Sequence, residues 1–158
     1  MCSTMCYSSS SKTRSINNMN IISDDKIDMS IFEFRHNKFS EIIPENSIVL
    51  DIGAHIGMFS LIFGSCVGKE GKVLAFEPNP KTFESLKYKA DNNPSFNIIP
   101  YNYACTKEKG KFIFNYSDPK RFGTGTNGGF FDSLELGDQI KQFHSHQLEV
   151  NGVNLLDF

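Results

Sequence analysis

The sequence predicts an α/β fold in which parallel strands alternate with helices in a three-layer sandwich. Residues 48–52 and 73–76 are almost continuously apolar, as strands buried on both faces of a parallel sheet are. A segment with apolar residues at helical spacing follows each run, and a third strand is expected at about residues 96–104. The order strand, helix, strand, helix, strand needs crossover connections and predicts a parallel sheet.

Length, composition and charge limit the chain to one ordinary globular domain. It has 158 residues, 39% of them hydrophobic, and a net charge of -2. That balance gives no electrostatic attraction for nucleic acid or for an anionic membrane. The first 20 residues lack the apolar run of a secretion signal, and no stretch approaches the roughly 18 continuous apolar residues of a membrane span. We expect a cytoplasmic protein with neither nucleic acid nor membrane as a partner.

The residues that most often bind metals do not have the spacing of a metal site. The cysteines are Cys2, Cys6, Cys66 and Cys105. His144 and His146 could face the same side of a strand, but two ligands are too few for a closed site. We therefore expect free thiols in a reducing compartment and no metal.

The N-terminal part divides into a polar segment and an amphipathic one. Residues 1–25 are mainly Ser, Asn, Lys and Asp, and we expect a disordered tail there, with the domain running from 26 to 158. Apolar residues between Ile27 and Ile43 predict a helical or mixed segment that covers the sheet, and Pro44 begins a turn.

Helix signals follow the first two predicted strands. The first helix contains Ile56, Met58, Phe59, Leu61, Ile62 and Phe63. Gly64 or Gly68 can end it. Asn79 and Pro80 form a cap and first-turn pair for the second helix, which the Asn-Asn-Pro sequence at 92–94 stops. Its apolar face carries Phe83, Leu86 and Ala90.

The C-terminal part has strand patterns on either side of a glycine-rich segment. Residues 111–116 alternate Phe112, Phe114 and Tyr116 with smaller or polar residues, which predicts a half-exposed strand, and residues 147–153 predict another. Residues 117–129 include four glycines, so this loop is either mobile or a cover for a ligand.

The residues with the clearest chemical pattern lie between the first predicted strand and its helix. Asp51 ends the strand, and Gly53 and Gly57 let the backbone approach a ligand at the carboxyl ends of the strands. Glu77 ends the second strand 20 residues beyond Gly57, where an acid can accept hydrogen bonds from both hydroxyls of a ribose. The pattern indicates an adenosine-containing ligand, although an α/β domain without a nucleotide could carry the same acid by chance.

A nicotinamide-dependent oxidoreductase is the nearest alternative. Its fingerprint, Gly-x-Gly-x-x-Gly, receives a pyrophosphate at the helix N-terminus. Here Asp51 replaces the first glycine and would repel a pyrophosphate, whereas it can receive the ammonium group of a methionine moiety. The acid favours S-adenosylmethionine as the cofactor.

Three segments resemble the FkbM-like family of class I, Rossmann-like, S-adenosylmethionine-dependent methyltransferases. They are VLDIGAHIGMFSL, VLAFEPNPKTFESLKYKADNN and NIIPYNYACTKEKGKFIF, within residues 48–114. The resemblance implies that Asp51, Gly53 and Gly57 line the methionine end, that Glu77 holds the ribose and that Ala104 lies by the adenine. Ala54, His55 and Pro78 are further cofactor-binding candidates from the same motifs. His55 replaces the family's usual Asn, so its ring either contacts the cofactor or has no role.

The resemblance also implies a function and an incomplete domain. It suggests O-methylation of a small molecule or a sugar, with no residue assignable as the catalytic base. The family's Ile-Lys-Ile-Asp-Val-Glu-Gly strand is absent, so we expect a partial Rossmann-like fold that lacks the C-terminal strands and exposes the edge at residues 48–52. We expect that edge to meet a second copy or a completing chain. The alternative is an inactive fragment that binds the cofactor weakly or acts through a partner chain.

Overall fold

The computed structural model describes residues 12–16, 19–24, 26–116 and 146–157. The strands are β1 (Lys12–Ile16), β2 (Met19–Ser23), β3 (Ile48–Ile52), β4 (Lys72–Phe76), β5 (Ile98–Tyr101), β6 (Ala104–Cys105), β7 (Gly110–Tyr116) and β8 (His146–Val153). The helices are α1 (Met29–Ser40), α2 (Met58–Val67) and α3 (Pro80–Asn92), with 3-10 turns at Pro94–Phe96 and Leu155–Asp157. Cys2, Cys6, His144 and the glycine-rich segment at 117–129 lie outside the described residues.

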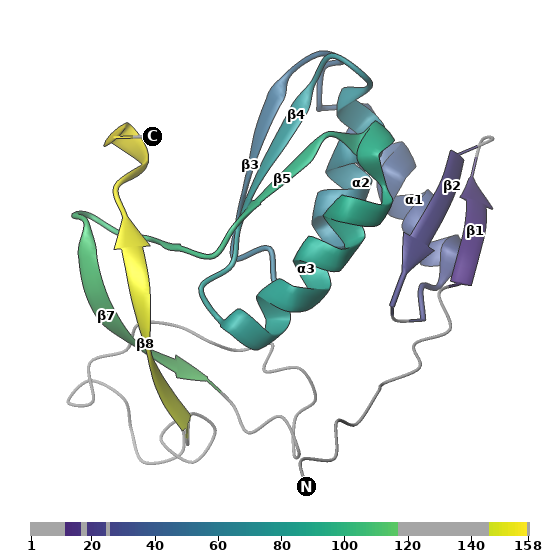
Figure 1. Cartoon of the computed structure of the whole chain (residues 1–158). Coiled ribbons are helices and arrows are strands. Elements are labelled where there is room, and N and C mark those ends of the chain that lie inside the picture. Colours follow the sequence, from purple (N-terminus) through teal and green to yellow (C-terminus); the bar gives the residue numbers. More distant parts are fainter. Residues whose placement is uncertain (1–11, 17–18, 25, 117–145, 158) are drawn as a thin grey trace, which may run out of the picture.

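The predicted parallel sheet is confirmed. Its order is β3-β4-β5, and all three strands run in the same direction (Figure 1). Ile52 pairs with Phe76, and Phe76 pairs with Tyr101, so the strands end level with one another. The residues that follow them therefore meet at one edge of the sheet, where ligands bind in open α/β folds.

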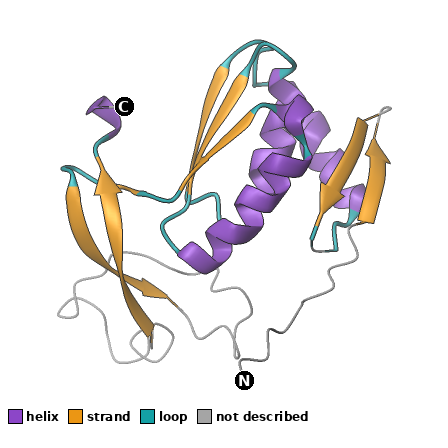
Figure 2. Ribbon diagram, viewed as in Figure 1, coloured by secondary structure: helices purple, strands orange, loops and turns teal. Residues whose placement is uncertain are grey.

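One face of this sheet is covered by helices (Figure 2). Val73, Ala75 and Ile98 point into a single apolar core together with residues of α2 and α3, and α1 packs on α2. The described residues thus form two of the three expected layers. No helix among them is long and apolar enough to cross a membrane.

The opposite face of the sheet is open at β3. Ile48, Leu50 and Ile52 alternate with inward-facing residues, and their exposed fractions are 65%, 49% and 57%. Within the described part of the chain, β3 pairs only with β4, so it also has an unpaired edge. The exposed apolar edge expected at residues 48–52 is confirmed.

The helix boundaries follow the sequence signals, and the structure decides between Gly64 and Gly68 as the end of the first predicted helix. Asn79 caps α3 by accepting the Lys81 N–H at 3.1 Å, as predicted. Helix α2 continues through Gly64 and ends at Val67, and Gly68 caps it with a φ of 72°. The absence of a side chain at Gly64 leaves room for Phe96, since a Cβ there would lie 2.6 Å from the Phe96 Cβ.

The third predicted strand, residues 96–104, is divided in the structure. Phe96 lies in a 3-10 turn, and Asn97 adopts a left-handed φ of 49° before β5 begins. After β5 the chain enters a second sheet of order β6-β8-β7, whose core holds Ala104, Phe114 and Val150. The break follows polar residues, since Asn97 precedes β5 and Asn102 follows it.

The N-terminal segment differs from the expectation of a disordered tail up to residue 25. Strands β1 and β2 form an antiparallel hairpin, and Ile21 is buried. Asn93 at the end of α3 holds β2 by accepting the Ile22 N–H at 2.8 Å and donating to the Ile22 carbonyl at 2.8 Å. No local pattern predicts this docking, because it depends on one amide side chain 71 positions away.

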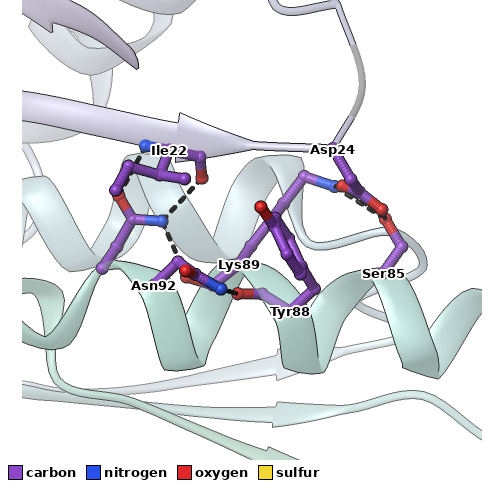
Figure 3. Close-up of polar contacts among 7 residues, drawn as sticks. Ile22, Asp24, Ser85, Tyr88, Lys89 and Asn92 are labelled. Atoms are coloured by element: carbon purple, nitrogen blue, oxygen red, sulfur yellow. Dashed lines mark hydrogen bonds and ion pairs between the residues drawn. The ribbon is translucent and has the colours of Figure 1, made fainter. Parts of the chain in front are cut away.

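A buried ion pair provides a second attachment of this segment to α3 (Figure 3). The Lys89 ammonium lies 2.7 Å from the Asp24 carboxylate, and the Lys89 side chain is fully buried. Ser85 donates to the same carboxylate and accepts from Lys89. Burial raises the pKa of Asp24, but its bonds with Lys89 and Ser85 outweigh that effect and the pKa is lowered overall.

Candidate cofactor site

The turn between β3 and α2 is built from left-handed residues. The φ angles of Gly53, His55 and Gly57 are 78°, 54° and 85°. The N–H groups of Gly53 and Ala54 both donate to the Phe76 carbonyl at 2.9 Å. These bonds fix the turn to the end of β4, at the edge where the parallel strands terminate.

The two glycines of the turn have different roles. A Cβ on Gly57 would lie 2.8 Å from the Leu86 Cδ1 of α3, so this glycine permits close packing between helices. A Cβ on Gly53 would have no atom within 4 Å. Gly53 therefore presents bare backbone to open space, where a ligand can approach it.

Glu77 is buried and its carboxylate ties three segments together. Oε2 accepts the His55 N–H at 2.9 Å, and Oε1 accepts the Asn79 N–H at 2.8 Å and the Thr82 hydroxyl at 2.9 Å. An ionised carboxylate has about four acceptor positions. Described residues occupy three of them, which leaves one for a ligand hydroxyl as far as the described part of the chain is concerned.

Asp51 lies at the end of β3 with an exposed fraction of 9%. Ser60, in the first turn of α2, donates its hydroxyl to Oδ2 at 2.6 Å. Burial raises the pKa of Asp51, and the negative charge of Glu77 raises it further, against the opposing effect of the Ser60 bond. A cation placed beside Asp51 would relieve both unfavourable effects.

Asn102 joins the ends of two strands and was not predicted as part of the site. Its amide donates to the carbonyl oxygens of Glu77 and Pro78 at 2.8 and 3.1 Å. The Glu77 N–H in turn donates to the Tyr101 carbonyl at 3.0 Å. A polar residue directly after an apolar strand was the available signal for Asn102.

Most of the predicted site residues meet at this edge. They are Asp51, Gly53, Ala54, His55, Gly57, Glu77 and Pro78. Ala104 does not join them: it lies in the core of the second sheet with Phe114 and Val150. His146 begins β8, with its ring 5.4 Å from that of Tyr116. In the described ranges, no three potential metal-binding side chains gather.

The geometry defines an α/β domain with a candidate ligand site at the carboxyl edge of its sheet. A buried acid faces that edge at Asp51, a second acid at Glu77 keeps one acceptor position, and Gly53 offers open backbone between them. Such a site suits a ligand that combines a cationic group with a hydroxylated one.

The comparisons with known proteins identify the family. Residues 51–155 match the model described as "Methyltransferase FkbM domain", and the chain belongs to this family. A curated relative, "Hexuronic acid methyltransferase AglP" from Haloferax volcanii, is 30% identical over 103 residues. The match covers 63% of this chain and 41% of the relative, so the chain spans less than half of the relative's length.

Two solved structures also share similarity with the chain. TYW2 from P. horikoshii in complex with MeSAdo has a TM-score of 0.45 and 24% identity over 61% of this chain and 37% of that protein. TYW2 from M. jannaschii in complex with AdoMet has a TM-score of 0.42 and 25% identity over 57% and 42%. The family assignment rests on the family model.

Proposed function

We propose that the turn after β3, together with Asp51 and Glu77, binds S-adenosylmethionine and that the chain belongs to an enzyme that methylates an oxygen of a small molecule or sugar. The observation that carries this proposal is the pair of acids around the open Gly53 backbone in a member of a methyltransferase family. Asp51 would receive the ammonium group, and Glu77 would accept one ribose hydroxyl.

The residues present fit this cofactor better than they fit a dinucleotide. A buried carboxylate with a raised pKa favours a cationic partner and disfavours a pyrophosphate. When bound, the cofactor would supply a sulfonium methyl group for transfer to the acceptor oxygen. The chain's residues would hold donor and acceptor in line, which is a large part of catalysis in such transfers.

The class of acceptor is proposed from the curated relative. Its description names hexuronic acid, which supports a sugar that carries a carboxylate. Incubation of the protein with methyl-labelled S-adenosylmethionine and D-glucuronate, with D-glucose in parallel, tests this. We expect label in the acidic sugar. Equal label in the two sugars, or label in D-glucose alone, would contradict the acceptor assignment.

A second proposal concerns the unpaired edge of β3. We propose that further polypeptide, either a second copy or a completing chain, covers Ile48, Leu50 and Ile52. Parallel sheets are normally buried on both faces, and these three side chains are about half exposed or more. If the edge must be covered for activity, the isolated chain would bind cofactor without transferring the methyl group.

A further inference from the structure

Ser60 is a fully buried polar residue in a mainly apolar helix. Its exposed fraction is 0%. The other buried residues of α2 are Leu61, Ile62, Gly64, Cys66 and Val67. A hydroxyl buried among such residues costs free energy unless it has a hydrogen-bond partner. The Asp51 carboxylate is that partner, since its Oδ2 accepts the Ser60 hydroxyl at 2.6 Å.

A second serine of the same helix shows a different arrangement. The Ser65 hydroxyl donates to the Ile62 carbonyl at 2.6 Å, within α2 itself. Serines inside helices commonly bond a carbonyl of the preceding turn in this way. The Ser60 hydroxyl instead crosses from α2 to the end of β3. The bond therefore links a helix to the strand end that carries the proposed ammonium-binding acid.

Asp51 depends on this bond more than Glu77 depends on any one of its own. In the described part of the chain, Ser60 alone donates a hydrogen bond to the Asp51 carboxylate, whereas Glu77 accepts bonds from three donors. An ionised carboxylate has about four acceptor positions. The bond to Oδ2 thus fixes one oxygen of Asp51 and leaves Oδ1 for a ligand.

The surroundings of Asp51 oppose its negative charge, with Ser60 as the exception. Burial raises the pKa of Asp51, the Ser60 bond lowers it, and the negative charge of Glu77 raises it again. A hydrogen-bond donor that favours the ionised carboxylate is therefore placed where burial and a like charge both disfavour it.

Other titratable groups of the adjoining elements are few. Helix α2 carries no Asp, Glu, Lys, Arg or His, and Lys72 lies at the opposite end of β4 from Glu77. The segment from β3 to the start of α2 contains one further titratable group, His55. A comparison between variants must therefore keep Glu77 and His55 unchanged.

We infer that Ser60 is a positioning residue of the proposed cofactor site, whose hydroxyl holds Asp51 through Oδ2 and leaves Oδ1 to receive the ammonium group of the cofactor. The inference rests on the proposed cofactor binding. A donor to the ionised form also extends toward acid the pH range in which Asp51 can pair with a cation. Helix α2 would in this way determine how strongly the site holds the methionine end.

Titration of the Asp51 carboxyl group, followed by ¹³C NMR of the full chain without cofactor, tests this inference. The proteins are the wild type, Ser60→Ala and the matched control Ser65→Ala. We expect the midpoint at higher pH in Ser60→Ala, because the donor to the ionised form is lost, and no change in Ser65→Ala. All three proteins keep Glu77 and His55. An unchanged midpoint in Ser60→Ala would overturn the inference.

Calorimetric titration with S-adenosylmethionine, at neutral pH and at several acidic pH values, provides a second readout. Ser60→Ala should bind about tenfold more weakly than the wild type in acid. The difference should narrow toward neutral pH, where Asp51 is ionised in both proteins. Titration of the cofactor's own groups cancels in the ratio of the two dissociation constants. A loss by the same factor at every pH would indicate a merely structural role and overturn the inference.

Ser60→Cys provides a further variant if Ser60→Ala does not fold, which urea unfolding establishes. The thiol remains at the same position but is a weak donor. The Asp51 midpoint and the cofactor affinity of this variant should therefore lie between those of the wild type and those expected of Ser60→Ala. A wild-type midpoint in Ser60→Cys would contradict the role of the hydroxyl.

Failure of this inference is distinguishable from failure of the proposed function. Cofactor binding by the wild type, with the same Asp51 midpoint and the same pH dependence in Ser60→Ala, overturns the role of Ser60 alone. No binding to the wild type at millimolar cofactor contradicts the proposed function, and Ser60 then has no cofactor to position.

Discussion

The Glu77 carboxylate accepts the backbone N–H of His55 at 2.9 Å across 22 residues of sequence. His55 has a φ of 54°, a backbone angle that residues other than glycine adopt only at a cost in free energy. The bond offsets that cost and fixes the turn after β3. The acid that would hold a ribose hydroxyl therefore also shapes the backbone against which the cofactor would lie.

Gly57→Ala should destabilise the protein more than Gly53→Ala. Both substitutions place a Cβ on a backbone with positive φ, which costs about 1–2 kcal/mol. Only at Gly57 would the new methyl group overlap Leu86, which adds about 1–3 kcal/mol. Urea unfolding of the two variants measures the difference, and equal losses would contradict the packing role of Gly57.

Asp51→Asn should raise the free energy of unfolding at neutral pH. Because burial raises the pKa of Asp51 in the folded state, the folded protein binds this proton more tightly than the unfolded chain. Stability from this group is therefore greatest below its unfolded pKa and falls as the pH rises through the folded pKa. The gain in the variant should be larger at pH 7 than at pH 3. A loss at pH 7 would show that the charge stabilises the fold.

The Asp24–Lys89 pair should couple by about 1–2 kcal/mol in a double-mutant cycle with Asp24→Asn and Lys89→Met. The Lys89 side chain is fully buried, so the pair is little screened by solvent. The exposed pair of Lys87 and Asp91, 2.7 Å apart on the same helix, is the matched control and should couple by about 0.3–0.5 kcal/mol. Equal coupling in the two cycles would contradict the role of burial.

The same pair predicts a response to acid. The pKa of Asp24 is lowered in the folded state, so its contribution to stability is present above the unfolded pKa and is lost as the pH falls through the folded pKa. Asp24→Asn should therefore flatten the decline of the free energy of unfolding in acid, measured by urea unfolding between neutral pH and pH 2.

Leu50→Lys should reduce self-association of the chain without destabilising its fold, because the Leu50 side chain is 49% exposed at the edge of the parallel sheet. Ile113→Lys, at a 54% exposed position of β7, is the control, since antiparallel sheets tolerate a solvated face. Light scattering over a range of concentrations measures the effect. A monomeric wild-type chain at all concentrations would argue against pairing with a second copy.

The sequence predicts the parallel sheet and the turn after β3 because both depend on local patterns. The apolar run at residues 48–52, the turn glycines and the Asn79-Pro80 cap each determine their own segment. Glu77 was placed correctly because the carboxyl ends of parallel strands meet at one edge.

Other features depend on contacts between distant segments and left no local pattern. The attachment of β2 to α3 through Asn93, and the bond from Ser60 to Asp51, are visible only once the helices pack. The sequence pattern predicts Phe96 as a strand residue, whereas it lies in a 3-10 turn and packs against Gly64. A buried turn residue and a buried strand residue are both apolar, so the pattern does not distinguish them. Hydrophobicity reports burial, and not the partner that provides it.

Calorimetric titration with S-adenosylmethionine tests the central claim, that the turn after β3 and its two acids form a cofactor site. The most informative comparison is the wild-type chain against Asp51→Asn, since the Asn side chain keeps the shape and removes the charge. We predict saturable binding to the wild type, no binding of NAD, and an affinity at least about tenfold lower in Asp51→Asn. Equal affinity in the two proteins, or no binding to the wild type at millimolar cofactor, would contradict the account.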